Sequence, residues 1–427
     1  MNLWNLTLAV PLGALPAEMQ LMDALAQIGA RLIRAGRFVP VATIEAASGA
    51  DVLRLLRVDG VVTIERDSAA QAQPVRVRAA LNPDYSWPIE LIGGVSAHER
   101  TQGGGIIVAV LDTGIDLSHR EFAGAAILGA ESALEGKDPS DLANHGTTVC
   151  GIMVAQGVQM LGICPAAGLY SISVLAANGL GAASTVIAGI DRALELGAQV
   201  INMSFRFLEN ARPGSVDAAL EAATDAGVLL VAASGNESQR EILPSPAHSP
   251  HTIAVGAIGR NGRVPGWSNS APWPLGVDTV APGDNVPGPV VGGGYSLLAG
   301  TSYAAPLVSG ALALALAVHP EISAPGQTAM DPKFGVVLPS TVVSVRNQLL
   351  AHSHPIQDGL DIAGYGLIDA APMASARPTE PIFQDQVNDQ VNRSGAPVSV
   401  ALLAAGAAVA AIYWGGEKRT RRGRRQR

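Results

Sequence analysis

Five short segments of almost continuous apolar residues constrain the fold of this chain more than any other feature of its sequence. Helical patterns and turns rich in Gly, Asn and Ser separate them. Strands that are apolar along their whole length are buried on both faces, as parallel strands covered by helices are. The sequence therefore predicts an α/β domain with a doubly wound parallel sheet over residues 81–376. The segments are residues 106–111, 169–174, 200–203, 228–232 and 252–257, with helices at 183–196 and 216–226.

Composition excludes several classes of protein. The chain has 427 residues, of which 48% are apolar and 15% charged, a balance that disordered chains do not show. Its 28 basic and 36 acidic residues give a net charge of −8, without the basic footprint of a nucleic-acid-binding protein. We therefore expect no nucleic-acid partner. Cys150 and Cys164 are too few for a disulfide framework or a four-ligand zinc site, and we interpret both as small buried hydrophobic residues.

The beginning of the chain predicts a separate small domain over residues 1–80. Its apolar alternation and helical spacing follow the order βαββαβ, which is the split βαβ arrangement of ferredoxin-like units. Residues 1–17 have no basic stretch and contain polar residues, so they do not fit an export signal. The expected strands cover residues 6–12, 31–39, 41–46 and 61–65, and the expected helices cover 18–28 and 48–56, the second capped by Ser48.

A further region is appended at the C-terminal end. Residues 398–414 are nearly all apolar, and a helix of that length can cross a hydrocarbon core of roughly 30 Å. Seven Lys and Arg residues follow, which predicts a cytoplasmic tail and an extracytoplasmic main domain. Because no export signal is evident, the alternative is insertion by the C-terminal helix alone, with the main domain facing the cytoplasm. A buried Ala-rich helix is the alternative, because Ala and Gly favour insertion only weakly. We expect a linker at 377–396, a single transmembrane helix at 397–415 and a basic tail at 416–427.

Three motifs at predicted strand ends or helix starts each carry one residue of a Ser, His and Asp set. A serine hydroxyl needs a neighbouring imidazole to take its proton, and the imidazole needs a carboxylate to hold its tautomer. In doubly wound sheets, sites form at the carboxyl ends of the strands. The motifs therefore predict a nucleophilic hydrolase site. They are Val108-Ala-Val-Leu-Asp112-Thr-Gly114, Asn144-His145-Gly-Thr-Thr148 and Gly300-Thr-Ser302-Tyr-Ala-Ala-Pro306.

The surroundings of Ser302 predict where an oxyanion would be stabilised. Ser302 is expected to open a long apolar helix, with Pro306 in the first turn, where a missing N–H costs little. Unpaired N–H groups and the positive end of the helix dipole suit a developing negative charge. Asn236 follows the strand at 228–232, and its side-chain amide offers a second donor.

Each motif also has a purely structural interpretation. Asp-Thr-Gly is a common turn, and a single histidine is more often structural than catalytic. Gly-Thr-Ser is an ordinary helix cap, and Asn after Gly is an ordinary turn. The four features together, in one chain order and each at the end of a strand or the start of a helix, favour catalysis.

The order Asp, His, Ser and the residues around it resemble the subtilisin-like serine peptidases, the subtilase family. The resemblance implies that Asp112 orients His145, which acts as general base and acid. It also implies that Ser302 is the nucleophile and that Asn236 stabilises the oxyanion. The N-terminal domain resembles the family's propeptide, which inhibits its own peptidase and is removed by self-cleavage within about residues 72–82. The similarity covers residues 81–376 and includes Val200-Ile-Asn-Met-Ser204, Ala232-Ala-Ser-Gly-Asn236, Val280-Ala-Pro-Gly283 and Gly300 to Gly310.

The sequence departs from the family beside the pocket for the P1 residue, the residue on the amino side of the cleaved bond. Arg206 stands where the family commonly has glycine. One hypothesis is that Arg206 favours an acidic or polar P1 side chain, and the alternative is that it points into solvent. The substrate-binding residues implied by the resemblance are Ser204, Phe205, Arg206, Ala233, Ser234 and Gly235.

The resemblance also raises the question of calcium. Glu121 stands where a family ligand would be, but the family's calcium loop is shortened here to Gln156-Gly-Val-Gln159, which is poor in oxygen ligands. Calcium takes about six to eight oxygen ligands. The sequence therefore argues against a structural calcium ion, and it predicts neither a catalytic metal nor a required cofactor.

Taken together, these features predict a self-processing serine endopeptidase that acts on proteins or peptides and is tethered to a membrane by its C-terminal helix. The alternative is a subtilase-fold structural subunit of an envelope or secretion complex. A third possibility concerns only the tail, which also resembles sorting signals that are cut off.

Overall fold

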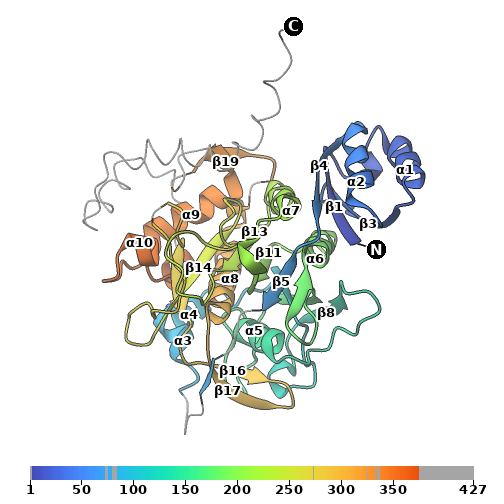
Figure 1. Ribbon diagram of the computed structural model, residues 1–427. Coiled ribbons are helices and arrows are strands. Elements are labelled where there is room, and N and C mark those ends of the chain that lie inside the picture. The colour runs from blue at the N-terminus through green and yellow to red at the C-terminus, as the bar shows by residue number, and fades with distance from the viewer. Residues whose placement is uncertain are drawn as a thin grey trace.

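The structure is a computed structural model that describes residues 2–72, 76–78, 84–272, 274–323, 325–331, 333 and 337–374. These residues form a small N-terminal unit and a larger α/β domain (Figure 1). Most of the apolar side chains of the N-terminal unit form a core of their own, whereas Val39, Val41 and Ala70 pack into the core of the larger domain. The two units are therefore distinct in fold and joined by apolar contacts.

A seven-stranded sheet forms the centre of the larger domain, as predicted. Every neighbouring pair of strands is parallel, in the order β15-β14-β13-β11-β7-β9-β8. Strand β11 lies in the middle and is fully buried, which explains why it is apolar except for Asn202, whose side chain bonds Ser204 and Ser309. The strands are β7 (Ile107–Asp112), β8 (Ile127–Ser132), β9 (Gly168–Ser173), β11 (Val200–Met203), β13 (Leu229–Ala233), β14 (Ile253–Ile258) and β15 (Thr279–Pro282).

Four long helices cover this sheet. α5 and α8 pack together on one face, and α6 and α7 pack together on the other (Figure 1). In the described part of the chain, α8 is the one helix long and apolar enough to cross a membrane, but 89% of it is buried, as expected for a core helix. Their bounds are α5 (His145–Val154), α6 (Ala183–Glu195), α7 (Gly214–Asp225) and α8 (Thr301–Val318).

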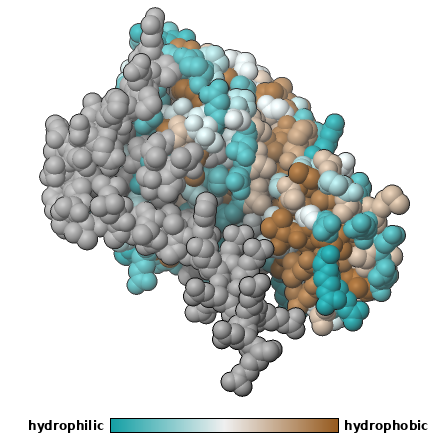
Figure 2. Space-filling model, turned by 90° about the horizontal axis from the view of Figure 1, so that it is seen from above, coloured by the Kyte–Doolittle hydropathy of each residue, from teal (hydrophilic) through white to brown (hydrophobic). Residues whose placement is uncertain are grey.

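The N-terminal unit has the predicted βαββαβ order, and its four antiparallel strands lie in the order β2-β3-β1-β4. Its sheet packs on α7, and its outer side carries exposed Met19, Met22, Leu53 and Leu56. Apolar surface is visible over the unit at the right of Figure 2. The elements are β1 (Asn2–Leu8), η1 (Leu12–Ala14), α1 (Glu18–Gln27), β2 (Arg31–Ala35), β3 (Val41–Ala46), α2 (Gly49–Val52), η2 (Leu53–Arg57) and β4 (Val61–Arg66).

Two details of the predicted N-terminal unit are wrong. The first strand was expected at residues 6–12 but spans Asn2–Leu8, because the chain leaves the sheet before Pro11, which has no N–H to donate. Ser48 precedes α2, but its side chain makes no capping hydrogen bond.

Two short strands continue the chain from the N-terminal unit across the larger domain. β5 (Ala69–Ala72) lies between β10 (Leu180–Ala182) and β12 (Phe205–Phe207) and is antiparallel to both. The other strand, β6 (Arg76–Arg78), pairs with β17 (Gly294–Ala299), which forms a hairpin with β16 (Val286–Val290). The chain therefore adds one strand to each of two surface sheets of the larger domain.

The remaining elements surround this framework. α9 carries Arg346, which is fully buried and pairs with Asp278 and Asp331, so that the helix is fixed to the start of β15. The predicted linker, transmembrane helix and basic tail all lie outside the described residues. The remaining elements are α3 (Trp87–Leu91), α4 (Gly94–His98), η3 (Arg120–Phe122), η4 (Leu208–Asn210), η5 (Pro320–Ile322), β18 (Thr328–Met330), β19 (Val337–Pro339), α9 (Ser340–His352), α10 (Leu360–Ala363) and α11 (Ala370–Met373).

Candidate active site

Asp112 and His145 meet where strand β7 ends and helix α5 begins. His145 Nδ1 lies 2.7 Å from Asp112 Oδ1, and the two side chains are only 2% and 0% exposed. The same carboxylate oxygen accepts the Thr113 N–H at 2.8 Å. His145 Nε2 has no hydrogen-bond partner among the described residues. This arrangement keeps the proton on Nδ1, which donates it as a hydrogen bond to the carboxylate, and leaves Nε2 free to accept a proton.

Asp141 is a second buried carboxylate at this site, and the sequence reasoning missed it. Its Oδ1 accepts hydrogen bonds from Thr113 Oγ1 at 2.9 Å and the Ala143 N–H at 2.8 Å, while Oδ2 accepts the Thr147 N–H at 2.8 Å. It thereby ties the end of β7 to the first turn of α5. An acidic residue just before a helix start was the available signal, since a carboxylate there satisfies unpaired N–H groups.

The surroundings of His145 set its pKa. Burial alone would lower the pKa, but the charge and hydrogen bond of Asp112, followed by the charge of Asp141, raise it above the ordinary value. The imidazole also lies against Tyr303, with ring centroids 5.9 Å apart. The protonated imidazole that forms when Nε2 takes a proton is therefore stabilised by two carboxylates.

Ser302 is the second residue of α8, and it is held against Ser204. Ser302 Oγ donates to the Ser204 carbonyl at 3.0 Å, and Ser204 Oγ donates to the Ser302 carbonyl at 2.9 Å. The expectation that Pro306 lies in the first turn is wrong, because Pro306 is the sixth residue of α8. Because Pro306 has no N–H, the Ser302 carbonyl lacks the donor that it would normally have four residues further along the helix. The Ser204 hydroxyl donates to this carbonyl instead.

Ser302 Oγ makes no hydrogen bond to His145 Nε2 in this structure, since it is turned toward the Ser204 carbonyl. Catalytic hydrogen bonds are often long or misaligned without a bound substrate. The structure thus brings Asp112 and His145 together and places Ser302 at the start of α8, a helix that packs on α5.

Asn236 is oriented by the first residue of α8. Its Oδ1 accepts both the Thr301 N–H at 2.9 Å and Thr301 Oγ1 at 3.0 Å, which fixes the amide so that Nδ2 points the other way. Nδ2 has no partner among the described residues and lies near Gly300. The preceding Gly235 has φ of +105°, and a Cβ there would lie 2.2 Å from Asn269 Nδ2. The predicted oxyanion donor is therefore buried, oriented and free.

The predicted substrate-binding residues fall into two groups beside Asn236. Ser204, Phe205 and Arg206 follow β11, whereas Ala233, Ser234 and Gly235 end or follow β13. Arg206 does not point into solvent, since it is 16% exposed and its Nε lies 2.8 Å from Glu237 Oε1; the preference for an acidic or polar P1 side chain stays a prediction. Sequence reasoning missed this partner, because no spacing pattern connects the two residues.

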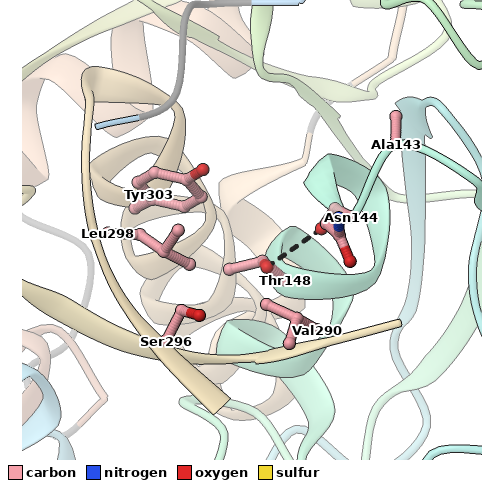
Figure 3. A pocket seen from close by; sticks show the side chains of 7 residues that line it. All are labelled: Ala143, Asn144, Thr148, Val290, Ser296, Leu298 and Tyr303. Atoms are coloured by element: carbon pink, nitrogen blue, oxygen red, sulfur yellow. Dashed lines mark hydrogen bonds between the residues drawn. The ribbon is translucent and has the colours of Figure 1, made fainter. Parts of the chain in front are cut away.

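A small cavity lies near the start of α5, beside Asn144 and Thr148. It has a volume of about 200 Å³ and lies between the start of α5, the β16–β17 hairpin and Tyr303 (Figure 3). Thr148 Oγ1 donates to the Asn144 and Pro289 carbonyls beside it, at 3.0 and 2.8 Å. Its lining residues are Ala143, Asn144, Thr148, Val290, Ser296, Leu298 and Tyr303.

The residues at the expected calcium position do not fit a cation. The Glu121 carboxylate is fully buried and accepts the N–H groups of Val158, Gln159 and Met160 as well as the Tyr295 hydroxyl. Burial raises the pKa of Glu121, but these donors lower it overall. N–H donors, not oxygen ligands, converge on this carboxylate. Within the described residues, no group of three or more His, Cys, Asp or Glu side chains is placed to hold a metal ion.

The two cysteines are free and fully buried, as predicted. Cys150 lies on α5, and burial raises the pKa of its thiol well above the ordinary value, assisted by the charges of Asp112 and Asp141. It is therefore a packed hydrophobic residue under the site.

An aspartate, a histidine and a helix-borne serine at the carboxyl ends of a doubly wound parallel sheet define a site of the Ser-His-Asp class. The family model described as "Subtilase family" matches residues 103–353, which is more than half of the chain. The chain belongs to the subtilase family, and the predicted family is confirmed.

Several curated relatives share this similarity. The thermophilic serine proteinase of Bacillus sp. (strain AK1) is 34% identical over 234 residues, which are 54% of this chain and 54% of that protein. The subtilisin-like protease 1 of Trichophyton rubrum is 34% identical over 229 residues, 52% of this chain and 44% of that protein. The chain spans about half the length of the curated relatives it matches.

Proposed function

We propose that this chain is a self-processing serine endopeptidase that is tethered to a membrane. The observation that carries the proposal is the Asp112–His145 pair with Ser302 at the start of α8 and the unused Asn236 Nδ2 beside it. Membership in the subtilase family and the printed names of the relatives support peptide bonds as the substrate.

The reaction follows from this arrangement. Ser302 Oγ rotates from the Ser204 carbonyl toward His145 Nε2, loses its proton there and attacks the carbonyl carbon of the peptide. The carbonyl oxygen of the peptide then carries a negative charge. It accepts two hydrogen bonds, one from Asn236 Nδ2 and one from the Ser302 N–H in the first turn of α8. Protonated His145 then gives its proton to the leaving amine, and water releases the acyl group by the same steps in reverse order.

The course of the chain supports self-processing. β5 lies on β12, with Ala72 opposite Phe205, and so approaches Ser204 and Ser302 from one side. β6 lies on β17, just before α8, with Arg76 opposite Ala299. Because β5 and β6 pair with strands that lead to Ser204 and to α8, we infer that the cleaved bond lies within residues 72–76. This range lies at the start of the wider window expected from the sequence.

Contacts of the N-terminal unit support its role as an inhibitor. The Glu65 carboxylate accepts the N–H groups of Gly214 and Ser215 at the start of α7. The Asp67 carboxylate accepts the Ser184 N–H at 2.8 Å at the start of α6. Carboxylates stabilise helix N-termini by hydrogen bonding and by charge. Two carboxylates from the N-terminal part of the chain therefore cap two helices of the larger domain, and these contacts help to hold β5 between β10 and β12.

Intact mass of the purified full chain tests the proposal. We expect the wild type to split within residues 72–76 during incubation at neutral pH, and Ser302→Ala to stay whole. Ser96→Ala, an exposed serine on α4, is the matched control and should split like the wild type. If the wild type also stays whole and hydrolyses no peptide, the structural-subunit alternative replaces the peptidase.

Membrane tethering is a separate part of the proposal and has its own test. The apolar residues 398–414 and the basic residues after them support a single anchor with a cytoplasmic tail and an extracytoplasmic peptidase domain. We expect the full chain to stay with membranes after alkaline extraction, and a chain ending at residue 396 to be released. Release of both proteins would contradict the anchor.

A further inference from the structure

Side chains from the segment between β7 and α5 hold the turn that joins β16 to β17. The Val291 N–H donates to Asn144 Oδ1, and the Gly292 N–H donates to Asp116 Oδ2, each at 2.9 Å. Asn144 immediately precedes His145 in the chain. The hairpin that leads into α8 is therefore fastened to the side of the site that carries the histidine.

Glu121 extends this attachment to the first residues of β17. Its buried carboxylate accepts the Tyr295 hydroxyl at 2.7 Å, in addition to three N–H groups of the loop that follows α5. Burial, followed by the hydrogen bond to Glu121, raises the pKa of Tyr295 to about 12, so the hydroxyl stays a donor. One carboxylate thus joins the loop after α5 to the strand that leads to Ser302.

Tyr295 is held from several sides, so its hydroxyl has a defined direction. Arg120 Nε donates to the hydroxyl oxygen at 3.1 Å, and the guanidinium carbon lies 5.3 Å from the ring centroid. The rings of His119 and Tyr85 meet the Tyr295 ring edge-on, with centroids 5.2 and 5.3 Å away. The hydroxyl therefore accepts from Arg120 and donates to Glu121, and the ring is fixed independently of the hydroxyl.

The attachment matters because β17 is paired along its whole length on one side only. It pairs with β16 on that side, and among the described residues its other side pairs only through residues 297–299, with β6. Because we infer that the cleaved bond lies within residues 72–76, β6 belongs to the segment that follows this bond. A substrate segment that binds as β6 does would meet the same edge of β17, so the position of β17 affects how well it fits.

We propose that Glu121 is a positioning residue that fixes β17 to the loop after α5 by hydrogen bonds alone, without a bound cation, and so keeps the strand in place for the substrate segment beyond the cleaved bond. The inference rests on the proposed peptidase function. Four donors reach the Glu121 carboxylate, which matches its roughly four acceptor sites. Three of them are successive N–H groups, and such a group of donors favours an anion and repels a cation.

Two variants separate the hydroxyl from the carboxylate. Tyr295→Phe removes only the hydroxyl and keeps the ring contacts with Arg120 and His119. Glu121→Gln keeps the size of the side chain but turns an amide NH2 group toward N–H donors, so it should loosen both the loop after α5 and β17. Tyr170→Phe is the matched control, because it removes a tyrosine hydroxyl from β9 in the central sheet.

The experiment measures kcat and KM of the self-processed full chain on two substrates that share the residues before the cleaved bond. One is a peptide that continues beyond the bond, and the other is a p-nitroanilide that ends there. We expect Tyr295→Phe to lower kcat/KM for the continued peptide about tenfold, mostly through KM, and for the p-nitroanilide less than about twofold. Glu121→Gln should show a larger difference of the same kind, and Tyr170→Phe should show none.

Independence from a cation is tested on the same proteins. EDTA should leave the ratio of the two kcat/KM values of the wild type unchanged, and added calcium should not restore this ratio in Glu121→Gln. A wild-type ratio that falls in EDTA and recovers with calcium would overturn an attachment made by hydrogen bonds alone.

Two outcomes separate this inference from the proposed function. If the wild type cleaves both substrates and the variants of Glu121 and Tyr295 lower both rates equally or lower neither, the positioning role is overturned and the peptidase stands. If the wild type neither processes itself nor cleaves either substrate, both fall. Thermal unfolding identifies a misfolded variant, and if Glu121→Gln does not fold, Tyr295→Phe still tests the attachment because it removes a single hydroxyl.

Discussion

The two halves of the active site differ in how completely their hydrogen-bond donors are paired before a substrate arrives. On the α5 side, His145 Nδ1 is bonded to Asp112, and both oxygens of Asp141 are occupied by donors. On the α8 side, Ser302 Oγ rests on a backbone carbonyl and Asn236 Nδ2 has no partner in the described part of the chain. The first half is complete in its donors, because its unpartnered atoms among the described residues, Asp112 Oδ2 and His145 Nε2, are acceptors, whereas the second half has a donor to spare.

This difference corresponds to two different roles in the reaction. The α5 side has to fix a tautomer and stabilise a cation, and neither task needs the substrate, so the bonds can exist in advance. The α8 side has to meet a negative charge that exists only during the reaction, so its donors stay unused until then. Substitutions on the two sides should therefore fail in different ways.

The largest effect should come from breaking the complete half at its centre. Asp112→Asn keeps the shape but presents an amide to His145 Nδ1, which favours the wrong tautomer and leaves the imidazolium without its charge partner. We expect kcat to fall by about 10⁴-fold. Self-processing and peptide hydrolysis should fall together, while the exposed control Asp138→Asn should process normally. A loss below tenfold would contradict the role of Asp112.

A smaller loss should follow from removing the unused donor on the α8 side. Asn236→Ala removes Nδ2 and also the Oδ1 that holds Thr301, whereas Asn236→Asp keeps an oxygen for Thr301, lacks the donor and adds a carboxylate charge beside the oxyanion. We expect both to lower kcat by roughly 10²–10³-fold with little change in KM. Near-normal turnover of Asn236→Asp would show that the residue anchors α8 and does not stabilise the oxyanion.

The elements of the fold that the sequence predicted are those whose cause is local. Residues 200–203 are apolar except for Asn202 because β11 is buried on both faces, and the predicted bounds match the structure. Asp112, His145, Asn236 and Ser302 were found because each stands at a strand end or helix start with its own motif. Periodicity and motif spacing carry this information in the sequence itself.

What the sequence did not predict depends on contacts between distant segments. Asp141 bonds Thr113 across 28 positions, and Arg206 meets Glu237 across 31, and no periodicity records either pair. The effect of Pro306 was missed for the same reason. Its missing N–H matters only because Ser204, far away in the chain, supplies a hydroxyl to the freed carbonyl. Polar partnerships of this kind appear only once the topology brings the strands together.

A moderate effect should separate positioning from charge within the complete half. Asp141→Asn keeps the volume but loses one acceptor for the N–H and hydroxyl donors around it, and it removes a charge that raises the pKa of His145. A buried donor left unsatisfied costs about 1–3 kcal/mol, so kcat should fall roughly tenfold.

The pH profile of Asp141→Asn provides a reading that a purely structural role would not change. His145 must be neutral to accept the serine proton, so the rate falls as the pH drops below its pKa. Because Asp141 raises that pKa, its neutralisation should move the acid limb of kcat/KM to lower pH. An acid limb at the wild-type position would show that Asp141 only holds the loop.

The smallest effect should come from the caps that keep β5 over the α8 half. Glu65→Gln retains an oxygen for the start of α7 but removes the charge that interacts with the helix dipole and loses part of the hydrogen bonding to Gly214 and Ser215. At about 1 kcal/mol for one cap, the separated N-terminal unit should inhibit the peptidase about fivefold less tightly. Glu18→Gln, exposed on α1 and facing away from the larger domain, is the matched control. Equal inhibition by the wild-type and Glu65→Gln units would show that the charge of this cap adds nothing to the binding of the unit, which would then rest on its other contacts, among them Val39, Val41 and the Asp67 cap.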